Sequence, residues 1–345
     1  MKLVSNPPSP WARYGTEWLG EPPSAKLEVY EETARSIISE NDSPDIGFRF
    51  SLNPYRGCFH ACAYCYARPT HQYLEYGAGT DFERKLVAKV NAPELLRKAF
   101  EKKSWTGETL VFSGVTDCYQ PLEATYELTR GCLKVCNEYR NPVSIVTKGA
   151  LTQRDVELLK ALHDRAGVQV HVSLAFSDEK MARLMEPGAP LPSARLRTLK
   201  VLSEAGIPVG LALAPVIPGL NDSQIPELIE RAKENGATRV FRTLLRLPAE
   251  VKPVFIERLE REFPGRAHKV LNAVREMRGG KLYRAEFHQR MTGEGERWKA
   301  IASIFDITCR RLGLNAKEER DLGREYDGVR NRFERPHKEE TGLLF

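Results

Sequence analysis

Long apolar runs, internal repeats and low-complexity tracts are all missing from this 345-residue sequence. A membrane-spanning helix needs roughly 18 or more consecutive apolar residues, and no segment approaches that length. The N-terminus, MKLVSNPPSPWARYG, also lacks the apolar core of a secretory signal. We therefore expect a protein that has no membrane segment and resides in the cytoplasm.

The arrangement of the cysteines argues against disulfides. The seven cysteines are an odd number, and three of them fall within eight residues. A reducing compartment would keep such residues as thiols. The net charge of +6 is a mild surplus, so it permits contact with a nucleic acid or a phosphorylated substrate without requiring one. The bases between Arg310 and Lys338 alternate with acids, which predicts a solvated surface.

The two ends of the chain differ from its middle. Residues 1–45 are rich in proline, serine and charge and predict an extended N-terminal arm, with one short helix over residues 30–39. Trp11 and Trp18 are expected to anchor this arm to the body of the protein. Residues 298–312 predict a terminal helix. The chain is thus divided into an arm (1–45), a core (46–290) and a C-terminal helix and tail (291–345).

Between these ends, strand-like and helix-like segments alternate. Short β-branched and apolar runs predict six strands, at residues 47–52, 110–115, 143–147, 168–174, 207–214 and 239–244. Helical periodicity is clearest at residues 123–138, 153–165, 194–205, 224–235 and 253–263. This alternation predicts parallel strands joined by right-handed crossovers. Six strands fall short of the eight of a complete TIM barrel, and a flat doubly wound sheet is the competing geometry.

The most informative motif follows the first predicted strand, at the end of a barrel where active sites form. Cys58, Cys62 and Cys65 have the spacing C-x3-C-x2-C, with the aromatic Tyr64 before the third cysteine. Three thiolates so close in sequence can hold three irons of a cubane cluster and leave the fourth iron open. A structural zinc site is the alternative. It usually needs two spaced ligand pairs, but no second C-x2-C pair exists, and His60 as a fourth ligand would be strained.

With this motif the chain resembles the radical S-adenosylmethionine (radical SAM) superfamily, whose signature is C-x3-C-x-aromatic-C. The similarity includes NPYRGC and ACAYCYARPTH around the cysteines, and also SGVTDCYQPLE (113–123), SIVTK (144–148) and APVIPGLND (214–222). These segments resemble the spore photoproduct lyase-related branch, in particular a DNA repair photolyase-like subgroup of unassigned substrate, over residues 34–314. The resemblance implies an α/β fold built on a partial (β/α)6 TIM-like barrel, with the N-terminal arm and a C-terminal helical extension.

The resemblance also implies cofactors and a reaction. A 4Fe-4S cluster on the three cysteines would bind the amino and carboxylate groups of S-adenosylmethionine (SAM) at its open iron. One electron, from a reductant such as flavodoxin or ferredoxin, would cleave the sulfonium C5′–S bond. The resulting 5′-deoxyadenosyl radical would abstract hydrogen from the substrate, and the protein would place and shield these groups. A nucleic acid or nucleotide is the first substrate hypothesis, by analogy alone.

Six residues are candidates for contact with SAM because they lie at the end of a predicted strand or follow one: Thr116, Asp117, Lys148, Ser173, Val216 and Gly219. Asp117 is expected to accept a hydrogen bond from the ammonium group, and Lys148 to meet the carboxylate, as a similarly placed lysine does in the lyase. Ser173 is assigned to the ribose or carboxylate, and the segment from Val216 to Gly219 to the adenine. The chain lacks the superfamily's Gly-Gly-Glu-like motif, so Thr116 and Asp117 are assigned by position only. The alternatives are a helix-capping aspartate and a surface lysine.

Tyr64, Tyr66 and Cys118 are the catalytic candidates. The tyrosines flank Cys65 and are expected either to take part in hydrogen transfer or to pack against the cluster. Cys118 is a candidate hydrogen donor, although an inert small side chain is the favoured interpretation. The donor cysteine of the lyase precedes the Ser/Thr-Asp pair, where this chain has Gly114. This departure argues against spore photoproduct chemistry itself.

The sequence therefore predicts a radical SAM enzyme of unassigned, lyase-like reaction. Two other functions stay open. One is radical modification of a peptide or protein side chain, and the other is a nucleic-acid-binding protein with a structural metal site and no radical chemistry.

Overall fold

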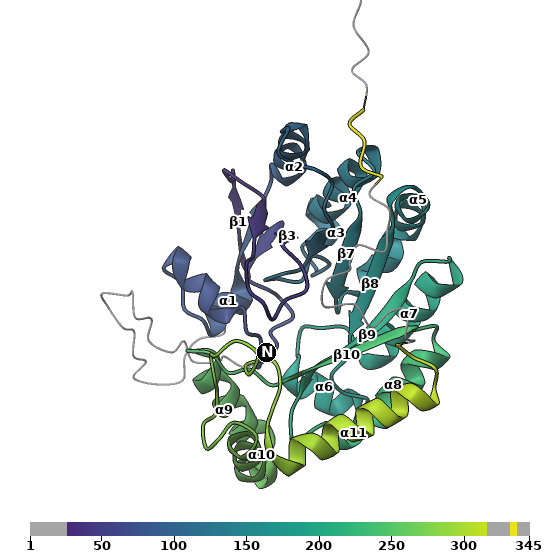
Figure 1. Ribbon diagram of the computed structural model, residues 1–345. Coiled ribbons are helices and arrows are strands. Elements are labelled where there is room, and N and C mark those ends of the chain that lie inside the picture. Colours follow the sequence, from purple (N-terminus) through teal and green to yellow (C-terminus); the bar gives the residue numbers. More distant parts are fainter. Residues whose placement is uncertain (1–25, 316–331, 337–345) are drawn as a thin grey trace, which may run out of the picture.

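Six parallel strands form the centre of the molecule (Figure 1). The computed structural model describes residues 26–315 and 332–336. The strands lie side by side in chain order: β3 (Phe50–Leu52), β6 (Leu110–Phe112), β7 (Val143–Thr147), β8 (Val168–Ser173), β9 (Val209–Val216) and β10 (Arg239–Leu244). β2 (Ile38–Glu40) pairs antiparallel with β3 at one edge, and within the described ranges it does not pair with β10. This open arrangement confirms the predicted partial (β/α)6 barrel. A doubly wound sheet would show a reversal of strand order.

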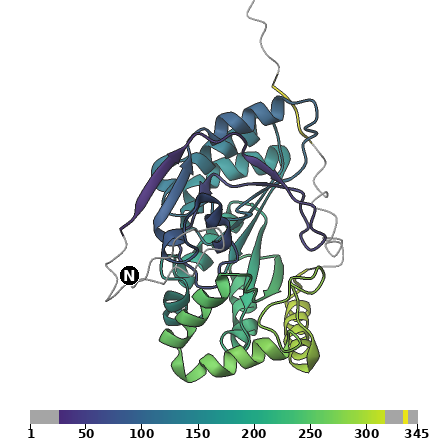
Figure 2. The same cartoon turned by 90° about the vertical axis from the view of Figure 1, so that its left-hand side faces the viewer.

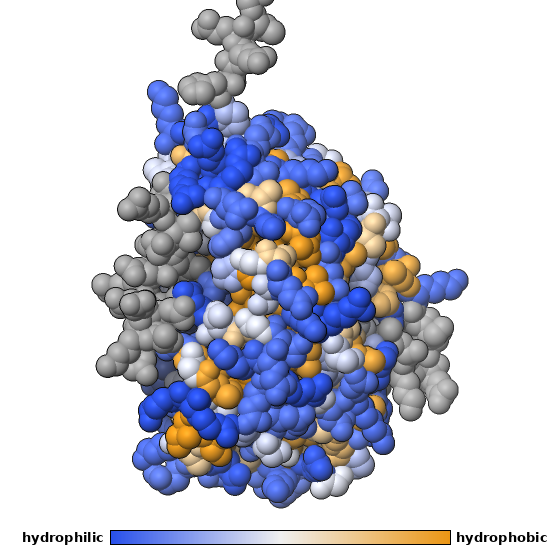
Figure 3. Space-filling model, turned by 90° about the vertical axis from the view of Figure 1, so that its right-hand side faces the viewer, coloured by the Kyte–Doolittle hydropathy of each residue, from blue (hydrophilic) through white to orange (hydrophobic). Residues whose placement is uncertain are grey.

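Helices cover the convex face of this sheet. They are α2 (Ala92–Glu101), α4 (Leu128–Glu138), α5 (Val156–Ala166), α7 (Pro192–Glu204), α8 (Ile225–Glu234) and α11 (Gly295–Arg311). In α8, for example, Ile225, Leu228, Ile229 and Ala232 are buried at helical spacing on one face. These faces and the strands form the main hydrophobic core. The outward surface on the side shown in Figure 3 is mainly hydrophilic, with hydrophobic residues in small groups.

A second, three-stranded sheet flanks the barrel. Its order is β1 (Glu28–Glu32), β5 (Lys85–Lys89) and β4 (Tyr55–Arg56), and Figure 2 shows β1 at the edge of the molecule. β4 lies in the chain between β3 and the cysteines, so this sheet fixes the start of the cysteine loop. The 3-10 helix η1 (Arg68–Leu74) and α1 (Thr80–Arg84) follow the loop.

The remaining helices support the cysteine loop and the strand ends. They are α3 (Glu123–Tyr126), η2 (Ala150–Asp155), α6 (Glu179–Met185), η3 (Asp222–Gln224), α9 (Val251–Glu262) and α10 (Pro264–Glu276). A second core cluster joins side chains of α6, α9 and α10 to Cys62, Ala63 and Tyr64. The cysteine loop therefore rests on a packed apolar base.

Small side chains on β9 keep the barrel interior open. Ala212 and Ala214 border an internal cavity. A Cβ atom on Gly210 would lie 2.6 Å from Cδ2 of His171, so only glycine fits beside this histidine. Large side chains at these positions would fill the barrel, as they do in closed TIM barrels.

Most predicted elements are confirmed, and several details are corrected. The strands predicted at 143–147 and 239–244 coincide with β7 and β10. The helix predicted over 123–138 is interrupted at Glu127, where φ is +49°, which separates α3 from α4. The helix predicted over 30–39 is wrong, because β1 ends and β2 begins within this range, and these strands pair with β5 and β3. Trp11 and Trp18 lie outside the described residues, as do 316–331 and 337–345.

No helix of the described chain is long and apolar enough to span a membrane.

Candidate functional site

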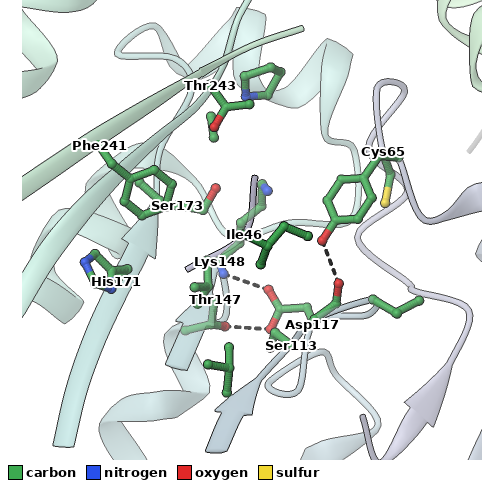
Figure 4. Close-up of a pocket in the computed structure, with 18 of the residues that line it drawn as sticks. Ile46, Cys65, Ser113, Asp117, Thr147, Lys148, His171, Ser173, Phe241 and Thr243 are labelled. Carbon is green, nitrogen blue, oxygen red and sulfur yellow. Dashed lines mark hydrogen bonds between the residues drawn. The ribbon is translucent and has the colours of Figure 1, made fainter. Parts of the chain in front are cut away.

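A cavity of about 570 Å³ opens at the carboxyl ends of the barrel strands and reaches into the barrel. Its volume lies within the range of roughly 300–1,000 Å³ that small-molecule and cofactor sites occupy. Most of the residues predicted from the sequence border it: Cys58, Cys62, Tyr64, Cys65, Tyr66, Thr116, Asp117, Lys148 and Ser173. Figure 4 shows Cys65 and Asp117 on one side of this space and His171 and Phe241 on the other.

The cysteine loop forms one wall of the cavity with the thiols of Cys58, Cys62 and Cys65. The first two thiols are buried, the third is partly exposed, and none is in a disulfide. The amide of Cys58 donates to the carbonyl of Phe82 in α1 (2.9 Å), and the amide of Ala63 donates to the carbonyl of Met185 in α6 (2.9 Å). Two distant parts of the chain therefore shape a loop that is local in sequence.

Gly57 permits the turn that begins this loop. Its φ is +70°, and a Cβ atom there would lie 2.8 Å from Cδ2 of Leu86 and 2.9 Å from the carbonyl oxygen of Phe82. The buried side chain of Gln120 holds the same turn. It accepts from the amide of Phe59 (3.0 Å) and donates to the carbonyl of Gly57 (3.1 Å).

Arg68 holds the other end of the loop. Its fully buried guanidinium donates twice to the carbonyl of Cys62 (2.8 and 3.1 Å). It also donates to the carbonyls of Ala78 (2.9 Å) and Gly79 (3.1 Å) and pairs with Glu83 at 2.5 Å. The five donors of a guanidinium suit such a junction, so the backbone of the central cysteine is fixed from behind.

The three thiols fit a cationic cluster core. Burial raises the pKa of Cys58, and nearby Asp117, Cys62 and Cys65 raise it further. Burial also raises the pKa of Cys62 to about 12, although the Lys148 cation acts against this. Three neighbouring thiolates, two of them buried, need a positive centre among them, which iron supplies. Among the described residues, no three His, Cys, Asp or Glu side chains converge on one ion. A cubane cluster does not require that convergence, since each cysteine binds a different iron.

Asp117 joins the cysteine loop to the end of β7. Its Oδ1 accepts from the hydroxyl of Thr147 (2.6 Å), and its Oδ2 accepts from the amide of Lys148 (2.7 Å) (Figure 4). Oδ1 also accepts from the amide of Tyr119 (2.9 Å). Oδ2 also lies 3.3 Å from Nδ1 of His60. Burial raises the pKa of Asp117, but His60 and the hydrogen bonds lower it more, so the carboxyl is ionised at neutral pH. Both carboxylate oxygens therefore already have hydrogen-bond partners within the protein.

Lys148 borders the cavity beside Tyr64, with Nζ 5.7 Å from the ring centroid. Within residues 26–315 and 332–336, its ammonium group makes no hydrogen bond or ion pair. Burial lowers the pKa of Lys148, but Cys62 and Glu186 raise it more, so the group is a cation. It is available to an anionic group of a ligand.

A buried ion pair lies behind Tyr64. The tyrosine hydroxyl donates to Oε1 of Glu186, and the guanidinium of Arg195 donates to Oε2. Arg195 also donates to the carbonyls of Pro190 (2.7 Å) and Ser173 (3.2 Å). The signature tyrosine is thereby tied to the α6–α7 connection and to the end of β8. Sequence reasoning missed both charged residues, because they are far from the motif in the chain.

The hydroxyl groups of Thr116 and Ser173 differ in availability. The Thr116 hydroxyl donates to the carbonyl of Tyr55 (2.9 Å), so it supports β4. The Ser173 hydroxyl has no hydrogen-bond partner in the part of the chain that the structure describes. Of the two, Ser173 is the one free to contact a ligand.

Three predicted site residues do not reach the cavity. Cys118 is completely buried in the main core, under the barrel. Val216 also packs in that core, and the adjacent Pro215 borders the cavity instead, because the register between β9 and β10 shifts at this point. Gly219 borders a separate pocket beside α10.

The β8 and β10 side of the cavity carries residues that no motif indicated. The ring of His171 makes an edge contact with Phe241, with centroids 5.3 Å apart. Burial and the neighbouring Arg239 lower the pKa of His171 to about 4, so it is neutral at pH 7. Arg246, just after β10, lies over the ring of Tyr66 at 5.3 Å. The inward alternation of strand residues could have indicated His171 and Phe241, but not Arg246, which lies after β10.

Comparison with known proteins identifies the family. The model of the radical SAM superfamily matches residues 52–232, just over half of the chain. A protein of Mycobacterium tuberculosis (strain ATCC 25618 / H37Rv), named "Uncharacterized protein Rv2578c", is 39% identical over 241 residues, which cover 69% of this chain and 71% of the relative. "Uncharacterized protein MJ0683" of Methanocaldococcus jannaschii is 31% identical over 199 residues, which cover 58% of this chain and 71% of the relative. The chain belongs to the radical SAM superfamily, as its cysteine motif predicted.

Solved structures of spore photoproduct lyase share the fold. The lyase complexed with dinucleoside spore photoproduct matches with a TM-score of 0.60 and 15% identity, over 86% of each chain. A mutant of the lyase with bound AdoMet and dinucleoside spore photoproduct matches with a TM-score of 0.59 and 15% identity, over 83% of this chain and 80% of the lyase. At this identity the likeness concerns the architecture.

Proposed function

We propose that this protein is a radical SAM enzyme that cleaves SAM reductively at a 4Fe-4S cluster and abstracts hydrogen from a substrate. One observation carries the proposal. Three free cysteines and the unpaired Lys148 cation border the same cavity, at the strand ends where barrel enzymes place their active sites. When bound, the cluster would supply the electron that breaks the C5′–S bond of SAM and so generates the 5′-deoxyadenosyl radical.

Cys58, Cys62 and Cys65 would each hold one iron. His60, which the spacing offers as a fourth ligand, has Nδ1 3.3 Å from Oδ2 of Asp117. Among the described residues, no three His, Cys, Asp or Glu side chains converge on one ion, which favours a cluster with an open iron over a closed zinc site with four ligands.

The residues of this chain would orient SAM around that iron. Lys148 would bind the carboxylate, and Ser173 offers a free hydroxyl to the ribose or carboxylate. Asp117 would act mainly by positioning Lys148 and His60, since its oxygens are already hydrogen-bonded. Val216 and Gly219 have no place in this proposal, because they lie away from the cavity.

Among the catalytic candidates, Tyr66 is best placed for hydrogen transfer. Its side chain is half exposed, and its hydroxyl donates to the carbonyl of Gly114 (2.6 Å). Tyr64 is committed to Glu186, and Cys118 is sealed in the core, so neither is proposed to react.

A nucleic acid or nucleotide is the proposed substrate class, supported by the fold shared with a lyase that was solved with a dinucleoside photoproduct. Gly114 in place of a donor cysteine favours a reaction other than that of the lyase. Flavodoxin or ferredoxin would supply the electron. All seven cysteines are free thiols, which suits the reducing cytoplasm that we propose as its compartment.

The test compares anaerobically reconstituted wild-type protein with Cys58→Ala, Cys62→Ala and Cys65→Ala. Iron content, visible absorbance and release of 5′-deoxyadenosine under a strong reductant are measured. Wild type should be brown and cleave SAM, whereas each variant should lose the activity. Cys309→Ala, on the buried face of α11, is the matched control and should keep it. Colourless wild-type protein with stoichiometric zinc and no cleavage would instead favour a structural metal site.

A further inference from the structure

Arg246 is an unpaired cation in a solvent-accessible part of the cavity. It borders the cavity just after β10, and its guanidinium carbon lies 5.3 Å from the ring centroid of Tyr66. The Tyr66 side chain is 48% exposed, so solvent reaches this region. Among the described residues, no acid pairs with Arg246 and no group accepts a hydrogen bond from it, and its Nε is buried without a partner.

The carboxylates of the cavity are already occupied. Asp45 pairs with Arg290 at 2.6 Å and accepts from the amide of His288 (2.6 Å). Asp117 is bound to the end of β7 and to His60, as described above. The other cavity arginines have partners: Arg242 pairs with Asp306 at 3.1 Å, and Arg239 donates to Gln169 (3.1 Å). Lys148 and Arg246 are left without an ion-pair or hydrogen-bond partner in the described structure.

This inference rests on the proposed function, in which SAM is bound in the cavity. SAM cannot neutralise the positive charges of both Lys148 and Arg246. SAM carries one carboxylate, against a sulfonium and an ammonium group, so it brings no surplus negative charge. Lys148 lies beside Tyr64 and Cys62, where that carboxylate and the thiolates would meet it. Arg246 contacts Tyr66 instead, and its positive charge and that of Arg278 repel each other. An anion that pairs with Arg246 would therefore have to come from a molecule other than SAM.

We infer that Arg246 binds an oxyanion of the substrate, a phosphate or a carboxylate. A guanidinium matches the two oxygens of such a group with parallel hydrogen bonds. The partly exposed ring of Phe241, in β10 and bordering the same cavity, offers an apolar surface to the rest of the substrate. Loss of a charged hydrogen bond in a partly buried site should weaken substrate binding by about 10- to 100-fold.

The test measures binding to the cluster-loaded protein with SAM present and no reductant, by titration calorimetry. Two matched probe pairs separate the sources of the oxyanion. The dinucleotide thymidylyl-thymidine, with one phosphodiester, is compared with thymidine, and the blocked tripeptide Ala-Glu-Ala is compared with Ala-Gln-Ala. Wild type, Arg246→Gln, Arg246→Lys and Arg197→Gln are compared. Arg197 is an exposed arginine of α7 and serves as the control.

In one of the two pairs, the affinity of wild type for the anionic probe should be at least about 10-fold higher than its affinity for the neutral probe. That preference should disappear in Arg246→Gln, be partly kept in Arg246→Lys and be unchanged in Arg197→Gln. Equal binding within both pairs, no binding to either pair, or a preference that survives Arg246→Gln would overturn the inference.

Release of 5′-deoxyadenosine by the same wild-type preparation separates this inference from the proposed function. If wild type cleaves SAM but shows no anion preference, only the oxyanion subsite fails. If it does not cleave SAM, the proposed function fails irrespective of the binding result.

Discussion

Glu186 holds a full negative charge in the protein interior, between the hydroxyl of Tyr64 and the guanidinium of Arg195. Burial raises the pKa of its carboxyl, but Arg195, Lys148 and Tyr64 lower it more, so the group stays ionised. When one partner of a buried ion pair is removed, the other charge is left uncompensated. This penalty is usually larger than that of a lost hydrogen bond.

We therefore expect Glu186→Gln to lower the free energy of unfolding by about 3–5 kcal/mol, because Arg195 loses its counter-charge. Tyr64→Phe keeps the ion pair and removes one hydrogen bond to a charged group, so it should cost only about 1.5–3 kcal/mol. Urea unfolding of the cluster-free protein, followed by circular dichroism, measures both. A larger loss in Tyr64→Phe would show that the ion pair is not what holds this region.

The residues of the site could be predicted from the sequence where they belong to the cysteine motif or lie at the end of a predicted strand. The spacing of the cysteines, the positions after β6 and β7 and the last residue of β8 pointed to side chains that border the cavity. Arg195 and Arg246 could not be found in this way. Their neighbours in space are remote in sequence. An arginine can bury its apolar stem or extend into solvent, so the sequence alone does not show whether its side chain is buried or exposed.

At the scale of elements, the parallel strands were predictable because their buried β-branched runs stand out from the helices around them. β1 was not, since its residues Glu28–Glu32 are mostly exposed and acidic and gain their structure only by pairing with β5. The break at Glu127 was also hidden, because the helical pattern continues through a residue whose φ is +49°. Tertiary contacts decide these cases.

Gly188 gives an element-scale prediction about the cysteine loop. Its amide donates to the carbonyl of His60 (3.1 Å), and a Cβ atom there would lie 2.0 Å from the carbonyl oxygen of Phe59. Gly188→Ala should push the loop away and lower the iron bound per chain after reconstitution, although residue 188 is no ligand. Gly265→Ala is the control, because a Cβ at Gly265 meets nothing within 4 Å. Full iron loading of Gly188→Ala would contradict the tight contact.

At the scale of the whole molecule, the barrel encloses a cavity, so side chains do not fill its interior as they fill that of a closed TIM barrel. Small residues on β9 leave room for the cavity, and residues from both ends of the described fold close its rim. Asp45, before β3, pairs with Arg290, before α11. Arg278 holds the same rim from below by donating to the carbonyls of Leu245 (2.8 Å) and Gln289 (2.8 Å). The rim thus depends on residues that the barrel strands do not contain.

Two buried histidines make the stability of this fold sensitive to mild acid. Burial lowers the pKa of His71 from 6.5 to about 4, and burial with the nearby Arg239 lowers that of His171 to about 4. Both are neutral in the folded protein, whereas the unfolded chain takes up protons below about pH 6.5. Protonation therefore favours unfolding as the pH falls from about 6.5 to about 4, by up to roughly 3 kcal/mol for each histidine.

We expect the free energy of unfolding to fall steadily between about pH 7 and about pH 4.5, and to fall less in the double variant His71→Gln/His171→Gln. The buried carboxylates do not produce this slope. The pKa values of Asp45 and Asp117 are lowered by their partners, so their stabilising charge is lost only below about pH 4. Urea unfolding at several pH values measures the slope in both proteins. Parallel slopes above about pH 4.5 would show that the two histidines do not take up their protons on unfolding.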